Sequence, residues 1–223
     1  MRKEDIKPNS TYLEIMFLVI QNYPIEGLGT LKQVLDSKGI STLTVNAENL
    51  TGKEEFDGLI VLGGPMGVYE MEKYPHLRKE VDLIQKAITE DKRVLGICLG
   101  AQLLSYALGG EVVKGAFGPE LGIGKVKFMG KLTDLGEIEV FQWHGDTFSL
   151  SEGSELLAYS EKYFQAFSFG HALGLQFHVE VNGKIVEKWI REYGGNPDWV
   201  REVEIRQNSF LRTASHLVEW WLR

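Results

Sequence analysis

The first half of the chain alternates between blocks of continuous apolar residues and blocks in which apolar residues recur at helical spacing. Continuous runs such as Ile15 to Ile20 are typical of strands covered on both faces of a sheet. The segment from Pro75 to Glu90 places apolar residues at 77, 81, 84 and 88, the spacing of an amphipathic helix. The expected elements are strands at 15–20, 41–45, 58–62 and 94–97 and helices at 31–38, 75–90 and 99–108. This order predicts an α/β fold with an open, mostly parallel sheet and flanking helices on both faces.

The second half of the chain is patterned differently. Short apolar runs separated by turn residues predict strands at 111–114, 125–128, 138–143, 156–160, 165–169 and 172–177. Helical spacing returns at 182–193 and in a last amphipathic stretch that ends near Leu222. The short strands predict a small antiparallel or mixed region added to the parallel sheet. Because no repeat or low-complexity linker divides the chain, we expect one domain over residues 1–223, with residues 1–11 as a polar lead-in.

Composition narrows the classes of function. The chain has 24 Lys and Arg against 31 Asp and Glu, so its formal net charge is −7, which gives no support to a nucleic-acid partner. A single cysteine allows no internal disulfide and no Cys/His metal cluster, so we expect no metal and a reducing compartment, the cytoplasm. The apolar run near the N-terminus is too short to span a bilayer. We therefore expect neither a signal peptide nor a membrane partner.

One stretch, Gly96-Ile97-Cys98-Leu99-Gly100, joins a predicted strand to a predicted helix. It has the Gly-x-nucleophile-x-Gly pattern of a nucleophile elbow, with cysteine in place of serine. The two glycines leave room for the tight turn, and the N-terminus of the following helix favours a thiolate. A single cysteine is more often a small buried hydrophobic residue. This context instead indicates that Cys98 is a reactive nucleophile.

A cysteine nucleophile needs a histidine as base or ion-pair partner, and a group that orients this histidine. Five histidines are candidates: His76, His144, His171, His178 and His216. His76 follows a proline at a helix start and His216 lies in the last helix, so we expect both to face solvent or to cap a helix. His171 lies at a predicted hairpin corner. His144 and His178 remain.

His178 closes a predicted strand, and Glu180 follows two residues later. In an extended chain residues two apart share a face, so Glu180 can accept the ring N–H of His178 and fix its tautomer. We therefore predict Cys98, His178 and Glu180 as the catalytic residues.

An acyl-transfer site also needs N–H donors for the oxyanion. The loop Gly63-Gly64-Pro65-Met66-Gly67 after a predicted strand can supply one donor, and the N–H of Leu99, the residue after the nucleophile, can supply the second. The same loop lacks the Gly-x-Gly-x-x-Gly spacing of a dinucleotide site, and no P-loop occurs in the chain. No cofactor is therefore predicted.

Four motifs in this order resemble the class I glutamine amidotransferases, and in particular the stand-alone domains similar to the amidotransferase half of GMP synthase. The motifs are Gly63-Gly64-Pro65, Gly96-Ile97-Cys98-Leu99-Gly100-Ala101-Gln102, Trp143-His144-Gly145-Asp146 and Gln176-Phe177-His178-Val179-Glu180, and the likeness spans roughly residues 15 to 192. The resemblance implies a flavodoxin-like α/β fold and a glutaminase that forms a γ-glutamyl thioester on Cys98. It also implies that ammonia passes to a synthetase site.

The resemblance also implies roles for further residues. Gly64 and Leu99 would offer the oxyanion N–H groups, and Gln102 with His144, Gly145 and Asp146 would line the glutamine pocket, mostly through the backbone. The family's His-Pro-Glu appears here as His178-Val179-Glu180, which removes a rigid residue from between the two triad members. No ATP-binding synthetase domain is recognised in these 223 residues, so a separate synthetase subunit is a possible partner.

Three readings of the function stay open at this point. The first is a glutamine-hydrolysing amidotransferase that serves an unidentified acceptor. The second is a γ-glutamyl peptidase, which would use the same triad and thioester on a γ-glutamyl compound. The third is a non-catalytic subunit that uses the pocket for glutamine sensing or assembly. An intact Cys98, His178 and Glu180 argues against this third reading, and the leucine after Cys98 argues against thiol hydrolases of the intracellular-protease type, whose cysteine is typically followed by histidine.

Overall fold

Strand β1 (Met16–Gln21) shows why the centre of the molecule is a sheet covered on both faces. Its side chains alternate between two apolar cores: Phe17 and Val19 pack into one, and Leu18 and Ile20 into the other. The computed structural model describes residues 15–223, so the expected lead-in at 1–11 lies outside the described residues, and the expectation of one domain over the whole chain stays a prediction.

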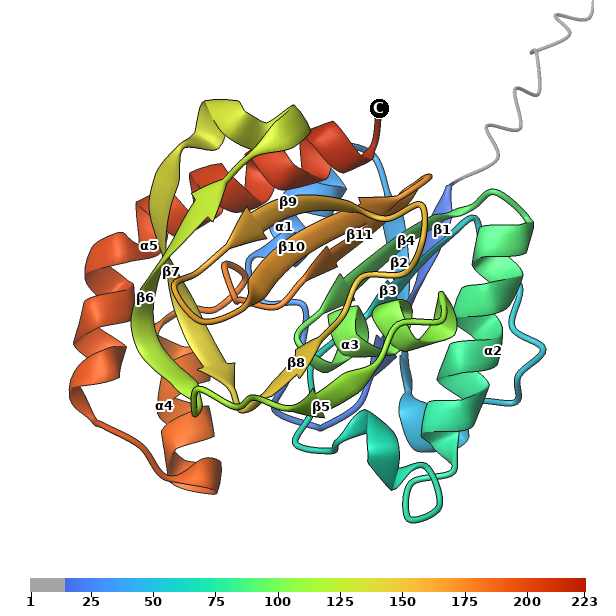
Figure 1. Ribbon diagram of the computed structural model, residues 1–223, viewed down its shortest axis with the longest axis horizontal. Helices are drawn as coiled ribbons and strands as arrows, with labels where there is room; N and C mark the ends of the chain where they lie inside the picture. The colour runs from blue at the N-terminus through green and yellow to red at the C-terminus, as the bar shows by residue number, and fades with distance from the viewer. Residues whose placement is uncertain (1–14) are drawn as a thin grey trace, which may run out of the picture.

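The main sheet has nine strands (Figure 1). Beside β1 they are β2 (Ser41–Asn46), β3 (Gly58–Val61), β4 (Arg93–Ile97), β6 (Glu120–Phe128), β7 (Glu137–His144), β9 (Glu155–Tyr159), β10 (Phe164–Phe169) and β11 (Ala172–Leu175). Their order is β2-β1-β3-β4-β11-β10-β9-β6-β7. Neighbours from β2 to β11 are parallel, and neighbours from β11 to β7 are antiparallel. A separate antiparallel pair consists of β5 (Val112–Lys114) and β8 (Asp146–Phe148).

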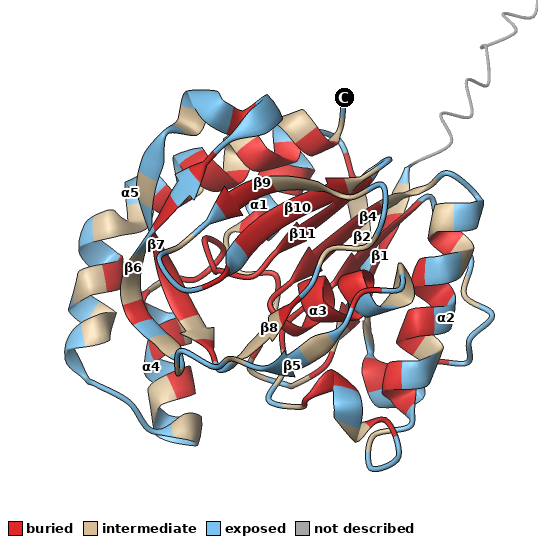
Figure 2. Cartoon of the chain, viewed as in Figure 1, coloured by how far each residue is buried: buried red, intermediate tan, exposed pale blue. Residues whose placement is uncertain are grey.

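Helices cover both faces of the sheet. The helices α1 (Leu31–Ser37), α4 (Gly183–Tyr193) and α5 (Asp198–Trp221) contribute to one core, and α2 (His76–Thr89) and α3 (Leu99–Ala107) to the other. Short 3₁₀ segments lie at η1 (Ala47–Asn49), η2 (Val68–Glu70) and η3 (Gly130–Leu135). Figure 2 shows the buried strands between helices whose outer faces are exposed. None of the helices in the described part of the chain is long and apolar enough to cross a membrane.

The predicted fold class is confirmed, with differences in detail. The antiparallel strands extend the same sheet, and β6 begins at Glu120, five residues before the predicted start at Lys125. Its first half is rich in glycine and is held by pairing with β7, which a local pattern does not reveal. The structure also adds β8, which was not predicted, because its three residues pair with the distant β5.

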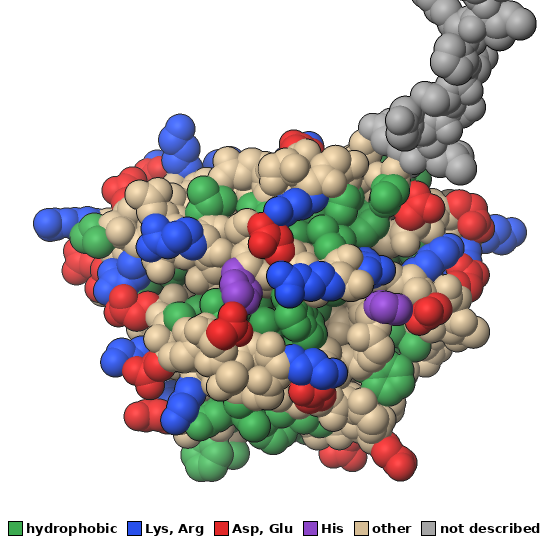
Figure 3. Space-filling model, turned by 90° about the horizontal axis from the view of Figure 1, so that it is seen from above, with side chains coloured by type: hydrophobic (Ala, Val, Ile, Leu, Met, Phe, Trp, Pro, Cys, Tyr) green, Lys and Arg blue, Asp and Glu red, His purple; other side chains and the backbone are tan. Residues whose placement is uncertain are grey.

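The expectation for His76 was wrong. This residue starts α2, but it is buried, with only 7 % of its surface exposed. His171 does lie at the turn between β10 and β11, and His216 lies partly exposed in α5. Figure 3 shows one face of the molecule, on which basic and acidic side chains are interspersed, so that face has no large patch of one charge.

Candidate active site

Cys98 occupies the sharp corner between β4 and α3. Its backbone has φ 52° and ψ −108°, a conformation that residues with a side chain rarely adopt. A Cβ atom on Gly96 would overlap the carbonyl oxygen of Gly100, and one on Gly100 would overlap the carbonyl oxygen of Val61 in β3. The two glycines are therefore required by the close approach of backbone to backbone, as the elbow pattern predicted.

His178 and Glu180 form a buried pair beside this corner. Nδ1 of His178 lies 2.6 Å from Oε1 of Glu180, and His178 is 2 % exposed. Burial lowers the pKa of His178, but the charge of Glu180, the nearby Cys98 and the hydrogen bond to Glu180 outweigh it, so the pKa lies well above its usual value. The surroundings of the ring therefore favour the protonated imidazole. In this state Nδ1–H donates to Glu180.

Val179 does not loosen the pair. Its backbone N–H donates to Oε2 of Glu180 at 3.0 Å, a hydrogen bond that a proline at this position could not make. The backbone carbonyl of Glu180 accepts a further hydrogen bond, from the N–H of Thr30 at 2.8 Å. Strand β11 itself ends at Leu175, and His178 is held by a single bridge to Phe141 of β7. The predicted contact between His178 and Glu180 therefore forms outside a regular strand, in a segment held in place by hydrogen bonds to Phe141 and Thr30.

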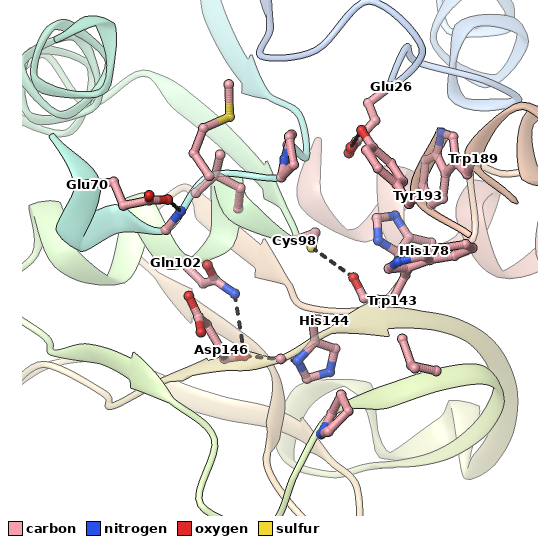
Figure 4. A pocket seen from close by; sticks show the side chains of 18 of the residues that line it. Glu26, Glu70, Cys98, Gln102, Trp143, His144, Asp146, His178, Trp189 and Tyr193 are labelled. Atoms are coloured by element: carbon pink, nitrogen blue, oxygen red, sulfur yellow. Dashed lines mark hydrogen bonds between the residues drawn. The ribbon is translucent and has the colours of Figure 1, made fainter. Parts of the chain in front are cut away.

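A cavity of about 400 Å³ opens above Cys98 and brings most of the predicted site residues together (Figure 4). It is lined by Glu26, Gly64, Pro65, Met66, Gly67, Tyr69, Glu70, Cys98, Leu99, Gln102, Pro119, Leu121, Trp143, His144, Gly145, Asp146, His178, Trp189 and Tyr193. Glu180 lies behind His178 and does not line the cavity. No lysine or arginine is among these described lining residues.

The two predicted oxyanion donors are neighbours at the cavity wall. A Cβ atom on Gly64 would lie 3.0 Å from the side chain of Leu99, so the loop after β3 packs against the first residue of α3. Leu99 occupies the first turn of α3, where backbone N–H groups have no partner within the helix. The N–H of Gly64 donates no hydrogen bond to another described residue. An oxyanion role for these two N–H groups stays a prediction.

His144 and Asp146 lie on another side of the cavity. His144 is the last residue of β7 and Asp146 the first of β8, so the predicted loop narrows to Gly145. The ring of His144 is engaged at both nitrogens: Nδ1 donates to the carbonyl of Asp146 at 2.9 Å, and Nε2 lies 3.1 Å from Oε2 of Glu120. These contacts leave His144 no free nitrogen for the thiol. Geometry therefore favours His178 as the partner of Cys98.

The structure adds Gln176, to which no role was assigned from the sequence. Its Nε2 lies 3.7 Å from Sγ of Cys98, and its Oε1 accepts a hydrogen bond from Nε2 of Gln102 at 3.1 Å. Gln102 in turn approaches the carbonyl of Asp146 at 3.5 Å. A chain of side-chain amides thus connects the nucleophile to Asp146. The sequence signal that could have identified Gln176 was a polar residue at the end of an otherwise apolar predicted strand.

Comparison with known proteins agrees with this geometry. A profile of the family described as glutamine amidotransferase class-I matches residues 30–190. The chain belongs to this family.

The relatives of this amidotransferase-family chain differ in the functions that their names give. It is 32 % identical to a glutamine amidotransferase from Thermotoga maritima, whose crystal structure superposes with a TM-score of 0.87 over 94 % of this chain and 99 % of that one. It is 32 % identical to a glutamine-hydrolysing GMP synthase subunit of Methanocaldococcus jannaschii, over 68 % of this chain and 79 % of the relative. It is 30 % identical to γ-glutamyl peptidase 5 of Arabidopsis thaliana, over 74 % and 67 %.

Sequence reasoning also missed Glu26, Trp189 and Tyr193, which line the cavity of this family member. Glu26 comes from the loop after β1, and the two aromatic residues come from α4. Trp189 packs edge-on against the ring of His178 at 4.9 Å between ring centroids. Nothing in the local sequence marks these residues, because they reach the site only through packing. Among the described residues no group of three or more His, Cys, Asp or Glu could hold a metal ion.

Proposed function

We propose that the protein hydrolyses the side-chain amide of L-glutamine through a γ-glutamyl thioester on Cys98, yielding glutamate and ammonia. The observation that carries this proposal is the single cavity shared by a cysteine at a strained elbow and a buried histidine paired with Glu180. Membership of the family supports glutamine-type chemistry.

In the first half of the reaction Sγ of Cys98, as thiolate, attacks the amide carbon and forms the carbon–sulfur bond. The carbonyl oxygen becomes an oxyanion that accepts hydrogen bonds from the N–H groups of Gly64 and Leu99. His178, held protonated by its raised pKa, donates the proton from Nε2 to the amide nitrogen. The carbon–nitrogen bond then breaks and ammonia leaves.

In the second half neutral His178 takes a proton from water, and the water oxygen attacks the thioester carbon. The carbon–sulfur bond breaks, glutamate leaves, and the thiolate–imidazolium pair is restored. Glu180 keeps the ring oriented and stabilises its charge in both halves.

The glutamyl part of the substrate fits the side of the cavity formed by Gln102, His144, Gly145 and Asp146. The side chains of Glu70 and Asp146 give this side a negative character that suits the α-ammonium group of glutamine. Burial raises the pKa of Asp146, although a hydrogen bond from Tyr69 opposes this shift.

A γ-glutamyl peptidase is the second candidate, because a relative with that name covers 74 % of this chain and the same thioester would serve. Similarity to the GMP synthase subunit supports the idea that ammonia passes to a separate synthetase chain. A cytoplasmic location stays a prediction.

The proposal is tested by ammonia release from L-glutamine and by labelling with a glutamine-mimicking electrophile. We expect the wild type to release ammonia and to carry the label on Cys98 in a peptide map, and we expect Cys98→Ala to do neither while it keeps a wild-type circular dichroism spectrum. Ammonia release by Cys98→Ala at the wild-type rate, or a label on another residue, would refute the assignment. Release of amines from γ-glutamyl peptides without ammonia release from glutamine would favour the peptidase.

A further inference from the structure

The side chain of Glu26 is a buried carboxylate in the wall of the cavity that the proposed reaction does not use. It is 7 % exposed, and its Oε1 accepts a hydrogen bond from the hydroxyl of Tyr193 at 2.7 Å. Figure 4 shows Glu26 on the same side of Cys98 as His178, Trp189 and Tyr193. Glu70, Gln102 and Asp146 lie on the other side.

The second carboxylate oxygen of Glu26 lies beside Gly63, and Cys98 lies beside the same glycine. A Cβ atom on Gly63 would overlap Oε2 of Glu26, and the same atom would lie 3.6 Å from Cβ of Cys98. The carboxylate and the cysteine therefore flank one point of the backbone. The glycine at 63 leaves the space that the carboxylate occupies.

The charge of Glu26 has no basic partner among the described lysines and arginines. Burial, together with the charge of Glu180, raises the pKa of Glu26 above its usual value, although the hydrogen bond from Tyr193 and the charge of His178 oppose this shift. No described lysine or arginine contributes to this pKa. A buried carboxylate without a lysine or arginine partner is costly in free energy, and buried titratable groups with perturbed pKa values cluster at functional sites.

The chemistry of the proposed reaction tells which part of the substrate meets this carboxylate. His178 must give its proton to the departing nitrogen, so the amine leaves on the His178 side of Cys98. That is the side on which Glu26 and Tyr193 lie. A carboxylate there attracts a positively charged amine and repels a second carboxylate.

We propose that Glu26 and Tyr193 form a leaving-amine subsite that favours γ-glutamyl amides whose amine part is ammonia or carries a positive charge, and that disfavours γ-glutamyl amino acids. This inference rests on the proposed amide hydrolysis and specifies its substrate class. In γ-glutamyl amino acids the carboxylate lies one carbon from the scissile nitrogen, where it would meet Glu26 without a compensating cation.

The test uses three amides of nearly equal size, with L-glutamine as reference: γ-glutamyl-1,2-diaminoethane, γ-glutamyl-n-propylamine and γ-glutamylglycine. Their amine parts end in an ammonium, a methyl and a carboxylate group. For the wild type we expect kcat/KM to fall in that order, with a ratio of the first to the last of about 100 or more. The ammonium compound gains a charge-assisted contact with Glu26, whereas the carboxylate compound meets a like charge. Glu26→Gln should lower this ratio at least about tenfold.

Glu192→Gln is the matched control. Glu192 is an exposed carboxylate of α4 that accepts a hydrogen bond from Tyr23 at 2.5 Å and does not line the cavity, so the ratio should stay at its wild-type value. A wild type that prefers γ-glutamylglycine would overturn the subsite. So would a Glu26→Gln variant that hydrolyses glutamine with an unchanged ratio.

Binding of the same three amides to Cys98→Ala, measured by calorimetry, separates this inference from the proposed reaction. If the wild type hydrolyses none of the compounds, the proposed function fails, and the order of the three dissociation constants still reports on the subsite. Equal binding of the cationic and anionic amides would then overturn it.

Discussion

The two halves of the sheet build the site in different ways. The parallel half, from β2 to β11, supplies groups at the carboxyl ends of its strands: Gly64 after β3, Cys98 after β4 and His178 beyond β11. The antiparallel half supplies His144 from the end of β7, held by Glu120 of the neighbouring strand β6. The first half places Gly64 and Cys98 by turns of the backbone, and the second places His144 by polar side chains that meet across strands.

This difference decides how each half responds to change. A corner such as the elbow tolerates no added atom, because backbone lies against backbone. A network of side chains can lose one member and keep the chain path. We therefore expect damage to the parallel half to stop the chemistry or the fold, and damage to the antiparallel half to weaken substrate binding.

The two buried histidines give the largest expected contrast. His178→Asn should lower kcat by about 10³-fold or more, because the proton donor and ion-pair partner of Cys98 is lost. His144→Asn should raise KM by roughly tenfold and leave kcat within about tenfold of the wild type, since its ring already bonds Asp146 and Glu120. Steady-state glutaminase kinetics measure both, and equal losses of kcat would contradict the contrast.

Two glycines of the site motifs test the backbone side of the comparison. Gly100→Ala should lower the free energy of unfolding by about 3 kcal/mol, because the new Cβ overlaps the carbonyl oxygen of Val61. Gly145→Ala is the control from the antiparallel half: its Cβ would meet nothing within 4 Å, so the change should stay within about 0.5 kcal/mol. Urea unfolding of the two variants decides this, and a similar loss in both would speak against it.

Glu80 tests how the parallel half accommodates a buried ionisable group. This residue of α2 is fully buried and accepts a hydrogen bond from Nδ2 of Asn22, which also donates to the carbonyl of Leu62 just before Gly63. Burial raises the pKa of Glu80 to about 8, although the bond from Asn22 opposes this. Between the usual carboxyl pKa of 4.5 and about 8 the folded state therefore holds a proton that the unfolded chain releases.

Stability should consequently fall as the pH rises through this window, by about 2 kcal/mol between pH 6 and pH 8. Glu80→Gln stays neutral and should lose this part of the fall, while Asp82→Asn, an exposed change in the same helix, should keep it. Urea unfolding at several pH values measures the slope. The same slope in Glu80→Gln and in the wild type would exclude Glu80 as its source.

The smallest expected effect concerns Gln176. Gln176→Leu removes the amide near the Cys98 sulfur and should lower kcat/KM by roughly tenfold. Gln142→Leu, the control, removes an equally buried amide that bonds Gln165 in the antiparallel half away from the cavity, so the activity of the folded variant should be retained. If both variants lose activity alike, the contact with sulfur has no separate role.

The sequence pattern was informative where all the residues that determine a structural feature lie in one short segment. The strand, glycines and helix around Cys98 are contiguous, and Glu180 lies two residues from His178. Helix α2 carries Leu77, Val81 and Ile84 on its buried face as its spacing predicted. The pattern did not predict the burial of His76, because that burial depends on packing that the neighbouring sequence does not show.

The sequence by itself therefore determined the α/β fold class, the elbow and the pairing of His178 with Glu180, because backbone sterics and side-chain alternation act over a few residues. Only the tertiary structure decided that Glu26 and Tyr193 line the cavity above Cys98, that Gln176 approaches its sulfur, and that both nitrogens of His144 are engaged. These contacts join segments up to 167 residues apart. They depend on how the strands and helices pack, which no local pattern encodes.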